Sequence, residues 1–492
     1  MSLDQAAIAA NRFGLGARPG ELKAIAGDPR GWLKAQLTPE TSLPATMADL
    51  PKTTVAAGEF PKWLIGLGIV GKQGGDIAKL YQNGGKDMTG AEAAPGMGAS
   101  GGQPLSIEQS YIKYFGPDYA AGVEARFTTA TTSERPFFER LSRFWSNHFT
   151  ISAAKPEIIS FAPIFERDVV RPHVCGRFED MLLASCRHPG MLMYLDNYTS
   201  IGPDSPLAHH PEYLPAFLRE RMKGLNENLA REIMELHTLG VRSGYTQTDV
   251  TTLAKIITGW SIYGPNQAPA SGEMFHYIDF AHQPGPQTLL GKTYPADGEQ
   301  QGRAALKDLA HHPATARHLA TKLARHFIAD DPPQAAVDRI AAAYSASDGD
   351  LTATANAIVD SPEAWTAPPA KLKTPDDYLV SIVRALDGPP VKGIQLVALL
   401  DRMGQRPFWP PGPDGWADIQ DGWIGADAVW KRLELASTLA QGYAAANINP
   451  ATIAEAALGP ELSPATAASI HAAESPAQGL ALFLVSPDFQ RR

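Results

Sequence analysis

The chain has 492 residues, with 43 lysines and arginines against 52 aspartates and glutamates, so its formal net charge is −9. Hydrophobic residues make up 44% and charged residues 19%, which supplies enough apolar material for a large core and excludes a wholly disordered chain. The acidic balance and the lack of a lysine- or arginine-rich stripe argue against nucleic acid as a partner. Cys175 and Cys186 are too few for a disulfide framework or a four-thiolate zinc site.

The amino terminus and the hydropathy of the chain predict a soluble protein. The first segment carries Asp4 and Arg12 and no long apolar run, so as written it is not a signal peptide. No stretch reaches the roughly 18–20 uninterrupted apolar residues that a membrane helix needs. The longest candidate, 63–70, is far shorter, so we expect no membrane span and, for the chain as written, a cytoplasmic location.

Helical periodicity dominates the chain from end to end. The pattern predicts helices at 6–12, 21–37, 104–128, 133–150, 158–170, 226–240, 246–259, 304–328, 334–346, 352–361, 378–386, 393–403, 426–443 and 475–485. Residues 84–103 are almost all small, which predicts a flexible loop. The best alternating pattern, at 274–280, predicts a short strand or hairpin arm. The expected fold class is therefore mainly α, with long irregular loops and little β structure.

The segment 226–260 holds the densest chemistry. On a helical wheel, Glu227, Asn228, Arg231, Glu232 and Glu235 fall on one face, opposite an apolar face. Neighbouring carboxylates repel unless a cation or a proton compensates them. One interpretation is a carboxylate cluster for acid/base chemistry or metal binding. The alternative is a solvated face in which Glu227, Arg231 and Glu235 form an ion-pair ladder.

Polar and aromatic residues also gather in other segments. His237 lies on the apolar side of the same helix, as a core histidine would. A third carboxylate, Asp249, forms a capping box with Thr246 before the next apolar run. Further candidates for substrate contacts lie in three places. Trp145, Asn147 and His148 lie at a predicted helix end, and Tyr198 follows an apolar run. Trp260, Trp409 and Trp416 lie later in the chain. The alternative is that the tryptophans pack in the core and the polar residues cap helices.

These segments together resemble the bacterial family DUF1800. The matching motifs are NRFGLGA at 11–17, FWSNHF at 144–149, HPGMLMYLDN at 188–197, NENLAREIMELHTLGVRSGYTQTDV with a later GW at 226–260, and PFWPPGPDGW followed by GWIGADAVW at 407–430. Because the order and spacing agree along nearly the whole chain, one DUF1800-like domain is expected over 1–492. The resemblance implies a helical protein of a family that is commonly exported, hence a periplasmic or secreted location if a leader was removed, and it implies no particular activity.

One motif departs from the family pattern. The family usually carries His-Asp-x-Gly-x-Lys before Leu-Gly, whereas this chain has glutamines at 283 and 287, between His282 and Leu290. Any chemistry of that motif is therefore in doubt here. The resemblance favours a specific role for the residues of the carboxylate face, because a merely solvated face seldom defines a family motif. A buried polar network that locks two helices together remains a second explanation.

One set of residues suggests a metal site. His276, Asp279 and His282 follow one another at a spacing of three, and histidine with carboxylate suits zinc, iron or manganese. On a strand the outer members of this pattern need not converge. No cofactor is predicted beyond a possible divalent metal.

The leading hypothesis is a hydrolytic enzyme, namely a glycoside hydrolase that acts on a polysaccharide through paired carboxylates. Glu232, Glu235 and Asp249 are the catalytic candidates, with Arg231 as charge partner, His148 as a substrate or proton contact, and the remaining polar and aromatic candidates as substrate contacts. There is no nucleophile elbow, phosphate-binding loop or dinucleotide fingerprint. The alternative function is a non-catalytic scaffold or partner-binding protein in bacterial export or surface assembly.

Overall fold

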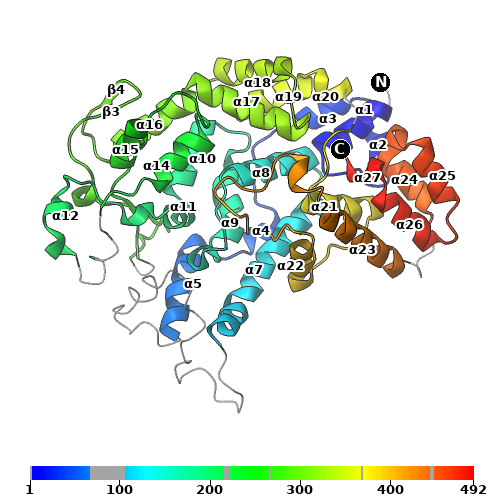
Figure 1. Ribbon diagram of the computed structural model, residues 1–492, viewed down its shortest axis with the longest axis horizontal. Coiled ribbons are helices and arrows are strands. Elements are labelled where there is room, and N and C mark those ends of the chain that lie inside the picture. The colour runs from blue at the N-terminus through cyan, green and yellow to red at the C-terminus, as the bar shows by residue number, and fades with distance from the viewer. Residues whose placement is uncertain are drawn as a thin grey trace, which may run out of the picture.

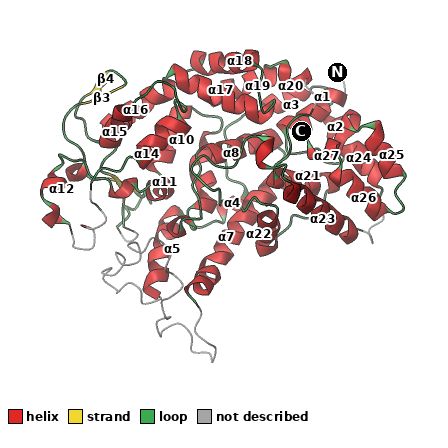
Figure 2. Cartoon of the chain, viewed as in Figure 1, coloured by secondary structure: helices red, strands yellow, loops and turns green. Residues whose placement is uncertain are grey.

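The computed structural model describes residues 3–66, 106–214, 219, 222, 224–264, 267–366, 369–443 and 448–492. The flexible loop predicted at 84–103 lies outside these residues. Helices make up most of the described chain, as the helical periodicity predicted, and the only described strands form two short hairpins (Figure 2). The expectation of a mainly α fold is therefore confirmed.

Helices follow one another along the described parts of the chain. The α-helices are α1 (Leu3–Ile8), α2 (Glu21–Ile25), α3 (Pro29–Ala35), α4 (Ala45–Ala48), α5 (Thr53–Gly66), α7 (Ile107–Thr132), α8 (Pro136–His148), α9 (Ala162–Phe165), α10 (Phe178–Arg187), α11 (Pro189–Tyr194), α12 (Pro206–His209), α14 (Asn228–Glu232), α15 (Gln247–Ile256), α16 (Glu299–His311), α17 (Pro313–Phe327), α18 (Gln334–Ala346), α19 (Leu351–Asp360), α20 (Glu363–Thr366), α21 (Pro375–Leu386), α22 (Gly393–Arg402), α23 (Ala426–Gly442), α24 (Pro450–Leu458), α25 (Pro464–His471), α26 (Pro476–Val485) and α27 (Pro487–Gln490). Three π-helical turns, η1 (Ala9–Phe13), η3 (Glu166–Val170) and η7 (Ile233–His237), extend α1, α9 and α14.

The two hairpins are antiparallel and lie at one end of the molecule. Strand β1 (Trp260–Ile262) pairs with β2 (Phe275–Tyr277), and β3 (Gln287–Leu289) pairs with β4 (Lys292–Tyr294). Strand β2 lies within the alternating segment 274–280, so the predicted hairpin arm is confirmed.

Prolines decide where many helices begin, because the ring fixes φ and its missing N–H costs nothing in the first turn. The predicted helix 21–37 is wrong as one piece: it divides into α2 and α3 at Asp28, the N-cap of α3, whose side chain accepts from Gly31 N at 2.9 Å. The predicted helix 304–328 likewise divides into α16 and α17 at His312, whose ring accepts the N–H of Ala314 at 3.1 Å.

Side chains from both ends of the chain share one hydrophobic core, which contains buried residues from Ala6 to Phe489. Figure 1 shows α17, α18 and α19 along one long edge, α10, α14, α15 and α16 at the end that carries β3 and β4, and α24 to α27 beside α1 and α2 at the other end. Helix α8 runs through the middle, and its residues are nearly all buried. The two termini of the described chain consequently lie on the same side of the molecule (Figure 1).

Because α8 is buried on nearly every face, its charged residues need partners inside the protein. Arg140 pairs with Asp377 of α21 at 3.0 Å, and Glu139 pairs with Arg171 at 2.7 Å. Arg143 pairs with Asp376, also on α21. The pairs with Asp376 and Asp377 tie α8 to the carboxy-terminal third of the chain, and the pair with Arg171 ties it to the turn that follows η3.

Candidate functional site

The predicted ion-pair ladder is present on the exposed face of α14 and η7. Arg231 lies 3.1 Å from Glu227 and 3.3 Å from Glu235, and it donates to the side-chain oxygen of Gln247 at 3.0 Å. Glu227 also accepts from the Thr251 hydroxyl at 2.6 Å. These contacts connect α14 to α15, so part of the carboxylate face serves to hold two helices together. Asn228, also on this face, is exposed.

Glu232 stands apart from the ladder. It is the last residue of α14, where the chain passes into the π-helical turn η7, a distortion that often occurs at functional sites. Its side chain is half-buried, and among the described residues none donates a hydrogen bond to it. Burial, followed by the negative charge of Glu235, raises the pKa of Glu232 to about 7 against the opposing effect of Arg231; Asp414 also raises it. This carboxyl therefore exchanges its proton near neutral pH.

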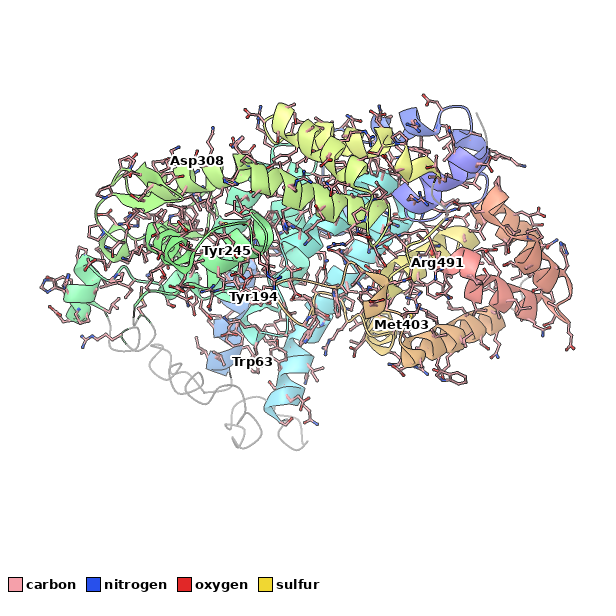
Figure 3. All side chains as sticks on the ribbon, turned by 45° about the horizontal axis from the view of Figure 1, so that its top comes forward. Trp63, Tyr194, Tyr245, Asp308, Met403 and Arg491 are labelled. Carbon is pink, nitrogen blue, oxygen red and sulfur yellow. The ribbon has the colours of Figure 1, made fainter. Side chains whose placement is uncertain are left out.

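Two tyrosines accompany the carboxyl groups. Burial and then the negative charges of Glu232 and Asp414 raise the pKa of Tyr194 to about 12. Burial and then a charge and hydrogen-bond contact with Glu235 raise the pKa of Tyr245 to about 12. Figure 3 shows both tyrosines in the same part of the molecule, well away from Arg491. Both hydroxyl groups remain protonated at neutral pH and are available as hydrogen-bond donors.

Asp414 reaches this site from a distant part of the chain, in the loop between α22 and α23. Asn147 at the end of α8 holds that loop through its side chain. Nδ2 donates to Trp416 O at 2.9 Å, and Oδ1 accepts from Trp416 N at 2.8 Å. Gly415 has a φ of +82°, and a Cβ there would lie 2.6 Å from Asn147 O. Sequence reasoning did not single out Tyr194 or Asp414; an acid inside the Pro- and Gly-rich loop was the available signal.

Asp249 is placed as a helix cap, as its capping-box pattern predicted. One carboxylate oxygen accepts from Thr246 N at 2.8 Å and from its hydroxyl at 2.7 Å, and the other accepts from Leu290 N at 3.0 Å. These hydrogen bonds lower the pKa of Asp249 in spite of its partial burial, which acts in the opposite direction. With both oxygens occupied, Asp249 is a structural residue in this geometry.

His148 lies in the core. Its side chain is 2% exposed, and Nε2 lies 3.1 Å from the carbonyl oxygen of His237. The rings of His237 and His318 are 6.0 and 6.3 Å from that of His148. Burial, assisted by the nearby Lys322, lowers the pKa of all three imidazoles, to about 3 for His237 and about 4 for His318. His148 is thus a neutral core histidine, and His237 is buried as the helical wheel predicted.

The predicted aromatic contacts divide into buried and half-buried groups. Trp145 and Trp260 are 2% and 0% exposed, so neither offers a face to a ligand. Tyr198 is half-buried against the core, and the Ser261 hydroxyl donates to its carbonyl oxygen. Trp409 carries the Arg406 guanidinium 3.8 Å above its ring, and Trp416 lies 5.8 Å from Trp423. Of the predicted tryptophan contacts, Trp409 and Trp416 are thus the two that are partly exposed and could contact a substrate.

The residues proposed for a metal point to different partners. The His276 ring stacks on Tyr263 at 4.2 Å, Asp279 accepts from the Tyr277 hydroxyl at 3.3 Å, and His282 Nδ1 lies 3.0 Å from Thr258 O. Within the described part of the chain, no group of three or more histidine, cysteine, aspartate or glutamate side chains is arranged to hold a metal ion.

The departure from the family motif has a structural role here. Gln283 is 5% exposed; its amide donates to Asp204 Oδ2 at 2.9 Å, and its carbonyl oxygen accepts from Asp204 N at 3.1 Å. This glutamine therefore fixes the 200–206 loop against the segment that follows β2.

In the described parts of the chain, no helix combines the length and the apolar character that crossing a membrane would require. No curated protein and no solved structure matches the chain. A family model described as "Protein of unknown function (DUF1800)" matches residues 8–491, and the chain belongs to this family.

Proposed function

We propose that the protein is a hydrolytic enzyme in which Glu232 is the general acid and Glu235 is the second carboxylate. The observation that carries this proposal is the pKa of about 7 at Glu232, a half-buried carboxyl that no described residue satisfies by a hydrogen bond. A general acid is most effective when its pKa lies near the working pH, because it then holds a proton that it can still release.

The environments of the two carboxyl groups differ in the way that paired acid and base roles require. Burial and the neighbouring carboxylates keep a proton on Glu232, whereas the Arg231 guanidinium forms an ion pair with Glu235 at 3.3 Å. Glu232 would donate its proton to the leaving group, and Glu235 would activate water or stabilise positive charge on the reacting carbon. Asp414 adds a third negative charge, which strengthens the hold of Glu232 on its proton.

For the substrate we propose a polysaccharide. Sugar rings stack on aromatic faces and form hydrogen bonds with acidic and hydroxyl groups. Tyr194 and Tyr245 lie beside the carboxyl groups, and the half-buried Trp409 and Trp416 lie on the loop that brings Asp414 to Glu232. Trp145, Trp260 and His148 have no part in this proposal because they are buried.

The test is the release of reducing ends from a panel of bacterial and plant polysaccharides. Glu232→Gln and Glu235→Gln should each lower kcat by at least a hundredfold, since a positioned acid or base contributes about 10²–10⁴ in rate. Glu434→Gln, which changes a carboxylate on the distant helix α23, is the control and should retain full activity. Full activity in both site variants, or no release from any glycan in the panel, would refute the proposal.

The alternative function is a non-catalytic scaffold or partner-binding protein in bacterial export or surface assembly. One observation favours it: the hydrogen bonds of Glu227, Arg231, Gln247 and Thr251 connect α14 to α15, as a structural network would. On this alternative, Glu232→Gln changes stability only and leaves every enzymatic readout at background. The same panel and the same variants therefore distinguish the two functions.

A further inference from the structure

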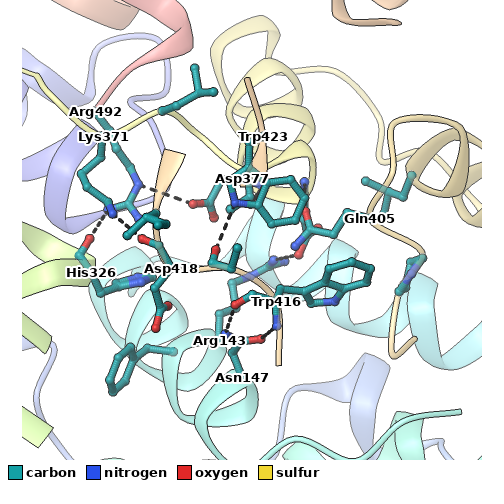
Figure 4. Close-up of a pocket in the computed structure, with 18 of the residues that line it drawn as sticks. Arg143, Asn147, His326, Lys371, Asp377, Gln405, Trp416, Asp418, Trp423 and Arg492 are labelled. Carbon is teal, nitrogen blue, oxygen red and sulfur yellow. Dashed lines mark hydrogen bonds and ion pairs between the residues drawn. The ribbon is translucent and has the colours of Figure 1, made fainter. Parts of the chain in front are cut away.

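A cavity that Glu232 and Glu235 do not line lies between α8, α21 and the 404–425 loop. Its volume is about 90 Å³. Figure 4 shows Arg143, His326 and Arg492 around it, with Trp416 and Trp423 among the other residues that line it. The Asn147–Trp416 hydrogen bonds that hold the loop form part of its wall. The cavity thus combines buried cationic groups with two tryptophans.

Three buried nitrogen atoms of the lining residues have no hydrogen-bond acceptor in the described part of the chain: Arg143 Nη2, His326 Nε2 and Arg492 Nε. The Arg143 and Arg492 side chains are 8% and 3% exposed. Arg492 Nε lies 3.5 Å from Asp377 Oδ2, in an ion pair without hydrogen-bond geometry. A buried donor without an acceptor costs about 1–3 kcal/mol, so it is rare to find several of them around one cavity.

The lining carries more positive than negative charge. The cations are Arg126, Arg143, Lys371 and Arg492, and the carboxylates are Asp376, Asp377 and Asp418. Burial and then the charge of Arg140 lower the pKa of Arg492 to about 9, and burial followed by Arg492 and Arg140 lowers that of His326. The cationic side chains around the cavity therefore favour a negatively charged ligand.

We propose that this cavity binds the carboxylate group of an organic acid. The Arg143 and Arg492 guanidinium groups donate to the carboxylate oxygens, and His326 donates from Nε2 in the tautomer that carries its proton there. Trp416 and Trp423 contact the remainder of the ligand where it leaves the cavity.

The shape of the donor groups favours a carboxylate. The volume of 90 Å³ exceeds the roughly 10–15 Å³ that one water molecule needs on the same measure, so a group of several heavy atoms can enter. The flat guanidinium groups of Arg143 and Arg492 suit the planar carboxylate.

The experiment measures binding to the full chain by calorimetry at constant ionic strength, with acetate, D-glucuronate, D-glucose and inorganic phosphate as probes. Acetate tests a free small acid, and glucuronate tests a carboxylate on a sugar ring. We expect saturable binding of acetate, glucuronate or both, and none of glucose. Tighter binding of glucuronate would identify a uronic acid as the ligand, and tighter binding of acetate would identify a small free acid; both results support the proposal.

Two variants and a control locate the binding site. His326→Leu removes a nitrogen that has no partner, so this variant should fold, and Arg143→Lys keeps the charge but removes Nη2. Each should weaken binding about tenfold, the effect of one charge-assisted hydrogen bond. Arg402→Gln, on the exposed side of α22, should bind as the wild type does.

Several results would overturn the proposal: no saturable binding of either carboxylate, glucose binding equal to that of glucuronate, phosphate binding more tightly than both carboxylates, or undiminished binding in His326→Leu. Because none of these readouts needs turnover, the proposal can fail while the hydrolytic function stands, and the reverse also holds.

Discussion

Asn147 and Trp416 are joined by two hydrogen bonds, one in each direction, of 2.9 and 2.8 Å. Through this pair, the buried helix α8 fixes a loop that lies almost 270 residues further along the chain. This loop contributes residues to two separate sites. It brings Asp414 to Glu232, and it supplies Trp416 to the wall of the cavity.

Gly415→Ala should destabilise the protein more than the same change at Gly404. Both glycines have positive φ, +82° and +87°, but an added Cβ at Gly415 would meet Asn147 O at 2.6 Å, whereas at Gly404 nothing lies within 4 Å. We expect a loss of about 2–4 kcal/mol at Gly415, from backbone strain and the clash together, and about 1 kcal/mol at Gly404. Chemical denaturation measures the loss in free energy of unfolding for each variant. Equal losses would contradict the close contact between Gly415 and Asn147.

Glu232→Gln should stabilise the protein at pH 8 and leave its stability nearly unchanged at pH 5. The folded-state pKa of Glu232 is raised from 4.5 to about 7, so its stabilising contribution is complete below pH 4.5 and is lost as the pH rises through 7. Glutamine does not titrate, so the variant does not lose this stability. We expect a difference in free energy of unfolding of about 1–2 kcal/mol at pH 8, after allowance for solvent screening. Urea denaturation at the two pH values measures the difference, and an equal gain in stability at both would argue against the raised pKa.

Arg231→Met should move the titration of Glu232 to still higher pH. Arg231 is the neighbouring group that lowers this pKa, so its removal leaves burial and the other carboxylates unopposed. The alkaline limb of the kcat profile should shift upward by about 0.5–1 pH unit, which corresponds to a charge interaction of about 1 kcal/mol. Arg303→Met, which breaks a comparable i,i+4 pair with Glu299, is the control and should leave the limb in place.

Asp249→Ala should lower stability and leave catalysis intact. It removes the cap of α15 and the acceptor of Leu290 N, at a cost of about 1–2 kcal/mol. Thr248→Ala changes the exposed neighbour and serves as the control for the helix itself. If Asp249→Ala abolished turnover, as Glu232→Gln is expected to do, the result would identify Asp249 as a catalytic group.

Most of the helices could be predicted because their signals are local. The helix 334–346 was predicted at its observed bounds, and the Thr246–Asp249 capping box was also identified. Helices α24 and α25 were missed, although Asn449-Pro450 and Ser463-Pro464 carry the signal of a capping residue before a first-turn proline. Their interiors are rich in alanine, so their amphipathic pattern is weak.

The candidate site was predictable only in part. The ladder of Glu227, Arg231 and Glu235 follows from helical spacing alone. Helical spacing cannot show that, of these glutamates, Glu232 accepts no hydrogen bond from the described residues, because that depends on which side chains approach from α11 and from the 404–425 loop. The sequence left open whether Trp145 and Trp260 pack in the core or contact a ligand, and the structure shows that both are buried, because burial depends on the elements packed over them.

By itself the sequence determined the helical class, the starts of many helices and the presence of three glutamates on one helical stretch, because caps, prolines and periodicity act over a few residues. Only the tertiary structure decided that these glutamates have different roles. Arg231 lies between Glu227 and Glu235, while burial, Glu235 and Asp414 surround Glu232. The physical reason is that a pKa depends on solvent access and on all nearby charges, and here one of those charges, that of Asp414, lies 182 positions along the chain.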